Sequence, residues 1–95
     1  MKNKSMYKSA IESSDYLTMS ETIVLMKIID LEENNISLLN PREIKNDLNL
    51  SHTAIYNAIN KLKAKGIITQ LNVKKNCYRI NEESLDYLYK LSKKI

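Results

Sequence analysis

The hydrophobic pattern changes its period at Gly66, the only glycine in this 95-residue chain, and this change most constrains the fold. Before Gly66, the apolar residues of segment 52–65 recur at helical spacing on one face. After it, segments 67–72 and 77–81 are β-like and are joined by a polar turn, which predicts a hairpin. A lone glycine directly after a periodic helix is typical of the left-handed residue that ends a helix. We therefore predict a helix that passes at Gly66 into a β-hairpin.

A second, shorter helix is predicted directly before this one. Asn40 can cap its start, and Pro41 suits the first helical position, where its missing N–H is not needed. The buried stripe is short, so the helix covers only residues 41–48. Ser51 then ends a three-residue turn and caps the helix of residues 52–65. Two helices joined by such a turn have helix-turn-helix spacing.

The remaining segments complete a mainly helical chain. Residues 1–19 form either an N-terminal arm or a short helix, because their apolar positions are scattered. Ser20 is predicted to cap a helix that is apolar nearly all round, and residues 36–39 form a short extended piece. Asn81 is predicted to cap a last helix over residues 82–95. The expected fold class is mainly α with a small β-hairpin, in the order α-β-α-α-β-β-α.

Length and composition limit the classes of protein to which this chain can belong. Ninety-five residues form one domain with one core. No apolar run approaches the roughly 20 residues that span a bilayer, and the start has no signal-peptide pattern. We therefore expect a cytoplasmic protein with no membrane partner. Cys77 is the only cysteine, so an internal disulfide and a cysteine-based metal site are both excluded.

The net charge of +4 comes from one part of the chain. Residues 51–81 carry six basic side chains and no carboxylate, whereas residues 1–50 carry six basic against eight acidic ones. Residues 82–95 are balanced, with three of each sign. The basic block coincides with the predicted helix and hairpin, so it makes a local positive field on folded elements. A polyanion is the expected partner.

A β-hairpin directly behind the second helix of a helix-turn-helix makes a winged helix. Here the chain resembles the winged helix-turn-helix DNA-binding proteins, in the manner of MarR-like regulators and small phage or plasmid transcriptional regulators. The resemblance covers roughly residues 20–90, with a winged domain at 20–81, and is carried by Pro41-Arg42-Glu43-Ile44, Leu48-Asn49-Leu50-Ser51-His52-Thr53-Ala54-Ile55, Ile59, Leu62, Lys65-Gly66-Ile67-Ile68 and Tyr78-Arg79-Ile80. It implies that helix 52–65 enters the major groove of double-stranded DNA. The wing, residues 67–81, would lie on the backbone or in the minor groove.

The helical wheel separates a core face from an outward face on the segment 52–65. Asn can bond adenine in bidentate fashion, Thr can touch a thymine methyl, and Lys can reach guanine or phosphate. A solvated helix usually mixes charge signs, but this one has no Asp or Glu. The predicted base-reading residues on the outward face and its edges are Thr53, Tyr56, Asn57, Asn60 and Lys61.

A second set of residues is predicted to contact the DNA backbone. Ser51 and His52 occupy a helix N-terminus, where N–H groups and the helix dipole attract phosphate. His52 is the only histidine and has no companions for catalysis or metal binding. Lys74 and Lys75 lie at the predicted wing tip. The full predicted set is Arg42, Ser51, His52, Lys63, Lys65, Lys74, Lys75 and Arg79.

An enzyme is not expected, because the sequence has no Gly-rich phosphate loop, no metal-ligand cluster and no plausible pair of catalytic carboxylates. No cofactor, metal or small-molecule substrate is expected either. The main hypothesis is a sequence-specific transcriptional regulator that binds double-stranded DNA. The alternatives are a DNA-binding protein of plasmid or phage replication or segregation, and a winged helix that serves as a protein-interaction module.

A homodimer is expected, because two half-sites multiply the discrimination that one winged helix achieves. The predicted dimer surface lies on the last helix at Leu88, Leu91 and Ile95. Leu85 and Leu88 can also pack within the protomer, so Leu91 and Ile95 carry most of this prediction.

Overall fold

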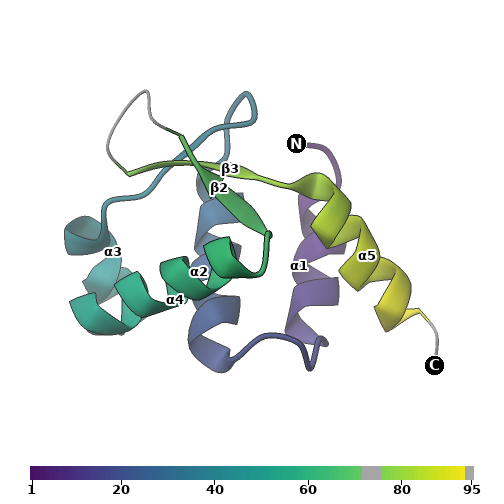
Figure 1. The fold of residues 1–95 in the computed structure, drawn as a ribbon, viewed down its shortest axis with the longest axis horizontal. Helices are drawn as coiled ribbons and strands as arrows, with labels where there is room; N and C mark the ends of the chain where they lie inside the picture. Colours follow the sequence, from purple (N-terminus) through teal and green to yellow (C-terminus); the bar gives the residue numbers. More distant parts are fainter. Residues whose placement is uncertain (72–75, 94–95) are drawn as a thin grey trace.

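The computed structural model describes residues 1–71 and 76–93. In these two ranges the chain forms five helices and three short strands, and the fold class predicted from the sequence is confirmed (Figure 1). Within these ranges, no helix combines the length and the hydropathy that a membrane span requires. The elements are α1 (Lys4–Glu12), α2 (Met19–Leu31), β1 (Ser37–Leu38), α3 (Pro41–Leu48), α4 (His52–Ala64), β2 (Ile68–Gln70), β3 (Cys77–Ile80) and α5 (Glu82–Ser92).

The three strands form one antiparallel sheet in the order β1-β3-β2. Ser37 of β1 lies opposite Tyr78, and Ile68 of β2 lies opposite Ile80. The extended piece predicted before the helix-turn-helix therefore joins the hairpin as a third strand. The predicted wing tip, with Lys74 and Lys75, lies outside the described residues.

The helix ends of the helix-turn-helix have the caps that the sequence predicts. The Asn40 and Ser51 side chains accept hydrogen bonds from the backbone N–H groups of Arg42 and Ala54, each at 3.0 Å. Gly66 has a φ of 74°, in the left-handed region, and its N–H donates to the carbonyl of Lys63 at 3.0 Å. The predicted glycine stop of α4 is therefore confirmed.

One predicted helix cap is wrong, and a second, Asn81, occupies the predicted N-cap position without the expected side-chain hydrogen bond. Thr18, and not Ser20, caps α2: its hydroxyl oxygen accepts a hydrogen bond from the Glu21 backbone N–H. Thr18 and Glu21 have the spacing of a capping box, in which two end residues satisfy each other. Asn81 makes no side-chain cap on α5; its amide donates instead to the Gly66 carbonyl, at 2.7 Å.

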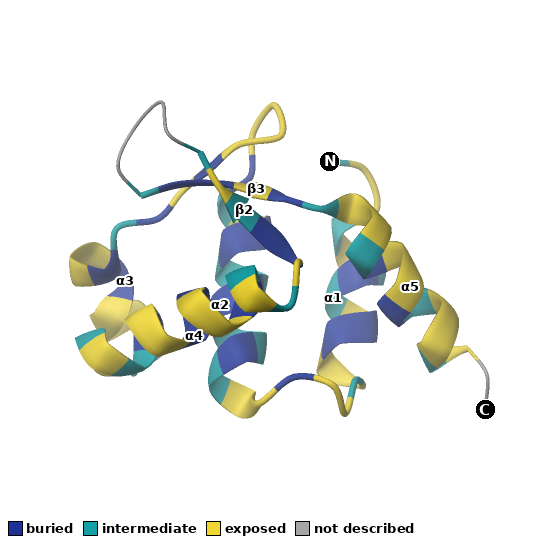
Figure 2. Ribbon diagram, in the orientation of Figure 1, coloured by how far each residue is buried: buried dark blue, intermediate teal, exposed yellow. Residues whose placement is uncertain are grey.

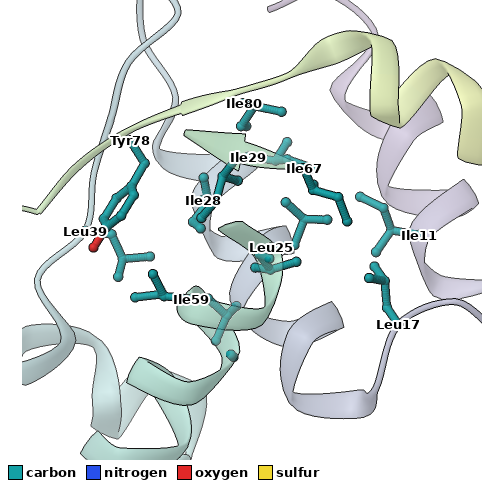
Figure 3. Close-up of a cluster of buried hydrophobic side chains, with 14 of the residues drawn as sticks. Ile11, Leu17, Leu25, Ile28, Ile29, Leu39, Ile59, Ile67, Tyr78 and Ile80 are labelled. Atoms are coloured by element: carbon teal, nitrogen blue, oxygen red, sulfur yellow. The ribbon is translucent and has the colours of Figure 1, made fainter. Parts of the chain in front are cut away.

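The core is built around α2, which is apolar on nearly all sides as the sequence predicted (Figure 3). Leu25, Ile28 and Ile29 are fully buried between the sheet, α1 and α4. Tyr78 of β3 reaches into the same core and is 2% exposed, so it packs as a core residue. Burial raises the pKa of its phenol.

The N-terminal segment is a helix and belongs to the core. Helix α1 packs against both α5 and α2, and it lies between them in Figure 1. Its side chains Tyr7 and Ile11 are 5% and 1% exposed. On α5, Leu85 and Leu88 complete this contact and are also buried. The prediction of Leu88 as a dimer contact is therefore corrected, because the protomer itself covers that side chain.

Candidate nucleic-acid interface

The outward side of α4 carries the residues predicted to read bases. Its opposite side packs into the core through Ile55, Ala58, Ile59 and Leu62, so the helix is fixed by burial. Figure 2 shows exposed positions along the length of α4. The structure brings together on this exposed side Thr53, Tyr56, Asn57, Asn60 and Lys61.

The neighbourhood of this face is cationic. Between Ser51 and the end of β3 the sequence contains no carboxylate. Beside Asn57 and Lys61, a shallow hollow is also lined by Thr18, Ser20 and Glu21 from the start of α2. The Glu21 carboxylate is engaged by Lys65, so it adds no unpaired negative charge to this face.

At the N-terminal end of α4, two predicted backbone contacts have local structural roles. The Ser51 hydroxyl is used in the cap of the helix. The His52 ring packs edge-to-face on Tyr56, with ring centroids 4.6 Å apart. Its Nε2 atom is buried and has no hydrogen-bond partner among the described residues. The His52 ring therefore packs against the Tyr56 ring at the edge of the outward face of α4.

At the C-terminal end of α4, two predicted backbone contacts are tied to neighbouring elements. Lys63 Nζ donates to the Gln70 side chain on β2 at 2.8 Å. Lys65 Nζ lies 2.5 Å from Glu21 Oε1 and donates to the Tyr16 carbonyl at 2.9 Å. Lys61 is exposed and has no ion-pair partner in the described part of the chain. The cations of α4 are thus not equivalent.

The other predicted backbone contacts among the described residues are Arg42 and Arg79. Arg42 is exposed at the start of α3, which precedes α4 in the helix-turn-helix. Arg79 is exposed on β3, opposite Thr69, where it lines a hollow together with Glu82 and Glu83. The surroundings of Arg79 therefore mix both charge signs, unlike the outward face of α4.

Sequence reasoning missed the group that holds Lys65. Glu21 is 4% exposed and accepts hydrogen bonds from Lys65 and from the Thr18 hydroxyl. Burial raises the pKa of Glu21, but the hydrogen bonds from Lys65 and Thr18 outweigh that effect and lower the pKa below its ordinary value. The spacing of Thr18 and Glu21 was a readable sign of the cap, whereas the contact with Lys65 spans 44 positions and has no local signal.

The helix-turn-helix of α3 and α4, followed by the β2–β3 hairpin and closed by β1, defines the chain as a winged helix-turn-helix protein. The family model of the DnaD N-terminal domain matches residues 13–94. Since that span covers most of the sequence, the chain belongs to the DnaD N-terminal domain family. Comparison with curated proteins and with solved structures found no match.

The family match relates the chain to DNA replication, including that of phages and plasmids. It fits the replication hypothesis at least as well as transcriptional control. The more particular resemblance to MarR-like regulators receives no support from the match.

Proposed function

We propose that this chain is a DNA-binding protein of plasmid or phage replication, with α4 in the major groove of double-stranded DNA. One observation carries the proposal: the exposed side of α4 combines hydrogen-bonding side chains with a cation and has no carboxylate. The family's relation to replication supports the biological role. The second winged-helix element, the hairpin of β2 and β3, would follow the backbone or the minor groove beside it.

The outward residues of α4 have two proposed roles: some contact the edges of DNA bases, and others contact the sugar-phosphate backbone. Asn57 and Asn60 can each bond the N6 and N7 atoms of adenine, and Thr53 can touch a thymine methyl. Tyr56 would lie against the sugar-phosphate edge, held there by the His52 ring. Lys61 supplies the charge that attracts phosphate or guanine.

Binding to a duplex at a series of salt concentrations tests this proposal. A mixed-sequence duplex should bind more weakly as salt rises, and Lys61→Gln should flatten the log–log salt slope by about 0.9. Lys90→Gln is the matched control, because Lys90 is exposed on α5 and its loss changes the net charge equally. An affinity that ignores salt, and that survives Asn57→Ala combined with Lys61→Ala, would contradict DNA binding. It would favour the protein-interaction module.

The biological role is tested by where the protein lies on DNA. A footprint over a replication origin or a partition repeat is expected for the proposed role. A footprint confined to promoters would support transcriptional control instead. Asn57→Ala should weaken the specific footprint more than it weakens binding to the mixed-sequence duplex, since base contacts carry sequence information and phosphate contacts do not.

We also propose that the protein binds as a homodimer through α5. Tyr87 and Leu91 lie one helical turn apart and are 63% and 40% exposed, and Tyr16 faces the same hollow with 53% exposure. Ile95, the third predicted dimer residue, lies outside the described residues. Sedimentation analysis of Leu91→Glu should show a shift toward monomer. Leu38→Glu, at a leucine on β1 that is 50% exposed, is the control and should leave the oligomeric state unchanged.

A further inference from the structure

The hollow beside α5 has one wall that does not belong to that helix. It measures about 540 Å³, and Tyr87 and Leu91 line it from α5. Across from them lie Tyr16, in the segment 13–18 between α1 and α2, and Lys65 at the end of α4. Tyr16 and Leu91 also line a second, adjoining hollow. The position of Tyr16 therefore shapes the whole surface next to α5.

The core fixes the backbone next to Tyr16 but does not cover its ring. Leu17 is 8% exposed and points into the core, which anchors the segment (Figure 3). The backbone N–H of Tyr16 donates to the Ser14 hydroxyl at 3.1 Å. Tyr16 itself is 53% exposed. An exposed side chain exchanges between rotamers unless another contact holds it, so the wall depends on such a contact.

Lys65 supplies that contact, because its Nζ atom binds both the ring and the backbone of Tyr16. The nitrogen lies over the ring, 4.7 Å from the centroid, where a cation is attracted to the aromatic face. It also donates to the Tyr16 carbonyl at 2.9 Å. Two contacts from one nitrogen thus define where Tyr16 stands.

Glu21 fixes the Lys65 nitrogen in turn. Its Oε1 atom lies 2.5 Å from Nζ, and the side chains of Glu21 and Lys65 are only 5% and 23% exposed. The other carboxylate oxygen accepts a hydrogen bond from the Thr18 hydroxyl at 3.0 Å, so the carboxylate has little freedom to turn away. A pair that is largely removed from solvent is also screened less by salt than an exposed one. The start of α2, the end of α4 and the Tyr16 segment are therefore joined at one nitrogen.

We propose that Lys65 is a positioning residue for the dimer surface: held by Glu21, it fixes Tyr16 as the wall that receives a second copy of this chain beside α5. This inference rests on the proposed homodimer, because it names the residue that shapes the same surface. A side chain that is ordered before association does not have to be ordered during it, and this lowers the cost of binding. Since Lys65 is the C-cap residue of α4, it also ties that helix to the dimer surface.

The test measures the dimer dissociation constant by sedimentation. Lys65→Met keeps most of the apolar stem and removes the ammonium group, so it should raise this constant by about fivefold or more, as truncation of a contributing interface residue does. Lys65→Arg should restore most of the affinity, since a guanidinium group can also pair with a carboxylate and lie on a ring. An unchanged constant in Lys65→Met would overturn the inference.

A matched control separates this effect from a change of net charge. Lys63 lies on the same helix and donates to Gln70 on β2, and it does not line either hollow. Lys63→Met loses the same charge as Lys65→Met, and we expect it to leave the dissociation constant unchanged. An increase equal to that of Lys65→Met would overturn the inference.

A double-mutant cycle tests whether Lys65 acts through Tyr16. Tyr16→Ala removes the ring and should itself weaken the dimer. If the role of Lys65 is to hold that ring, Tyr16→Ala combined with Lys65→Met should be no weaker than Tyr16→Ala alone. Losses that add would show that Lys65 contacts the second copy directly, which contradicts a positioning role.

Folding and the underlying proposal are checked in the same series. Lys65→Met leaves the buried Glu21 carboxylate without its cation, which destabilises the fold. If circular dichroism shows that this variant does not fold, Glu21→Gln with Lys65→Met takes its place, because it has the original net charge and no unpaired carboxylate. An original protein that stays monomeric defeats the proposed homodimer and this inference with it. A dimer that Leu91→Glu disrupts and Lys65→Met does not defeats this inference only.

Discussion

The hydroxyl of Tyr7 donates a hydrogen bond to the Asp86 carboxylate at 2.5 Å, and this contact joins α1 to α5 across 79 positions of the chain. Tyr7 is 5% exposed, so its ring also belongs to the core. The two ends of the domain are therefore connected by packing and by one charge-assisted hydrogen bond. This connection fixes α5 against α1, while Tyr87 and Leu91 stay exposed.

Tyr7→Phe should destabilise the fold while leaving the core packing intact. The lost hydrogen bond to a charged acceptor is worth about 1–2 kcal/mol, with the lower part of that range favoured because Asp86 is exposed. Urea unfolding followed by circular dichroism measures the change. Tyr87→Phe, whose ring is 63% exposed, is the control and should change stability by less than about 0.5 kcal/mol.

The same contact predicts a loss of stability at alkaline pH. The hydrogen bond to Asp86, together with burial and the negative charge of that carboxylate, raises the pKa of Tyr7 from 10.0 to about 12. The unfolded chain therefore ionises Tyr7 first, so this stabilisation is complete below pH 10.0 and is lost as the pH rises to about 12. The measurement is the difference in unfolding free energy between the original protein and Tyr7→Phe, in which the other tyrosines largely cancel. A difference that stays constant over this range would contradict the assignment.

Gly66→Ala should destabilise the domain through its backbone alone. The φ of 74° is a left-handed conformation, yet an added Cβ atom would meet nothing within 4 Å. The expected cost is about 1 kcal/mol, from the left-handed backbone and not from a clash. This corresponds to roughly 4–8 °C in Tm for a domain of this size. Gly66→Asn is the comparison variant. Because Asn tolerates a left-handed backbone, it should lower the free energy of unfolding less than Ala does.

The Glu21–Lys65 pair predicts a loss of stability in acid. The pKa of Glu21 is raised by burial but is lowered more by its bonds to Lys65 and Thr18, so in the folded state it lies below its ordinary 4.5. The stabilisation is therefore present above pH 4.5 and is lost as the pH falls through the folded-state pKa. Acid titration of the unfolding free energy should show a smaller loss for Glu21→Gln than for the original protein. Equal losses in the two proteins would mean that other carboxylates carry the acid sensitivity, such as the buried Glu32, whose pKa also lies below its ordinary value.

Much of the winged helix follows from local sequence signals. Asn40, Ser51 and Gly66 mark helix ends through chemistry that acts within a few residues, and the structure confirms all three. Gly66 also separates two hydrophobic periods, so the passage from helix to hairpin was predictable. The cap of α2 was misplaced by two positions because Ser20 and Thr18 are both good caps, and only the bonds of Glu21 distinguish them.

Helical periodicity alone indicates which side of α4 faces outward, because it sorts side chains whatever lies around them. Which cations of that helix are paired depends instead on how the helix packs against its neighbours. Lys61 and Lys65 look alike in the sequence, but packing of α4 against α2 brings Lys65 to Glu21 and leaves Lys61 exposed. The same holds for the N-terminal helix, whose scattered apolar residues acquire a common core only when α5 packs against them. Contacts between distant segments depend on how whole elements pack, and no short stretch of sequence encodes that packing.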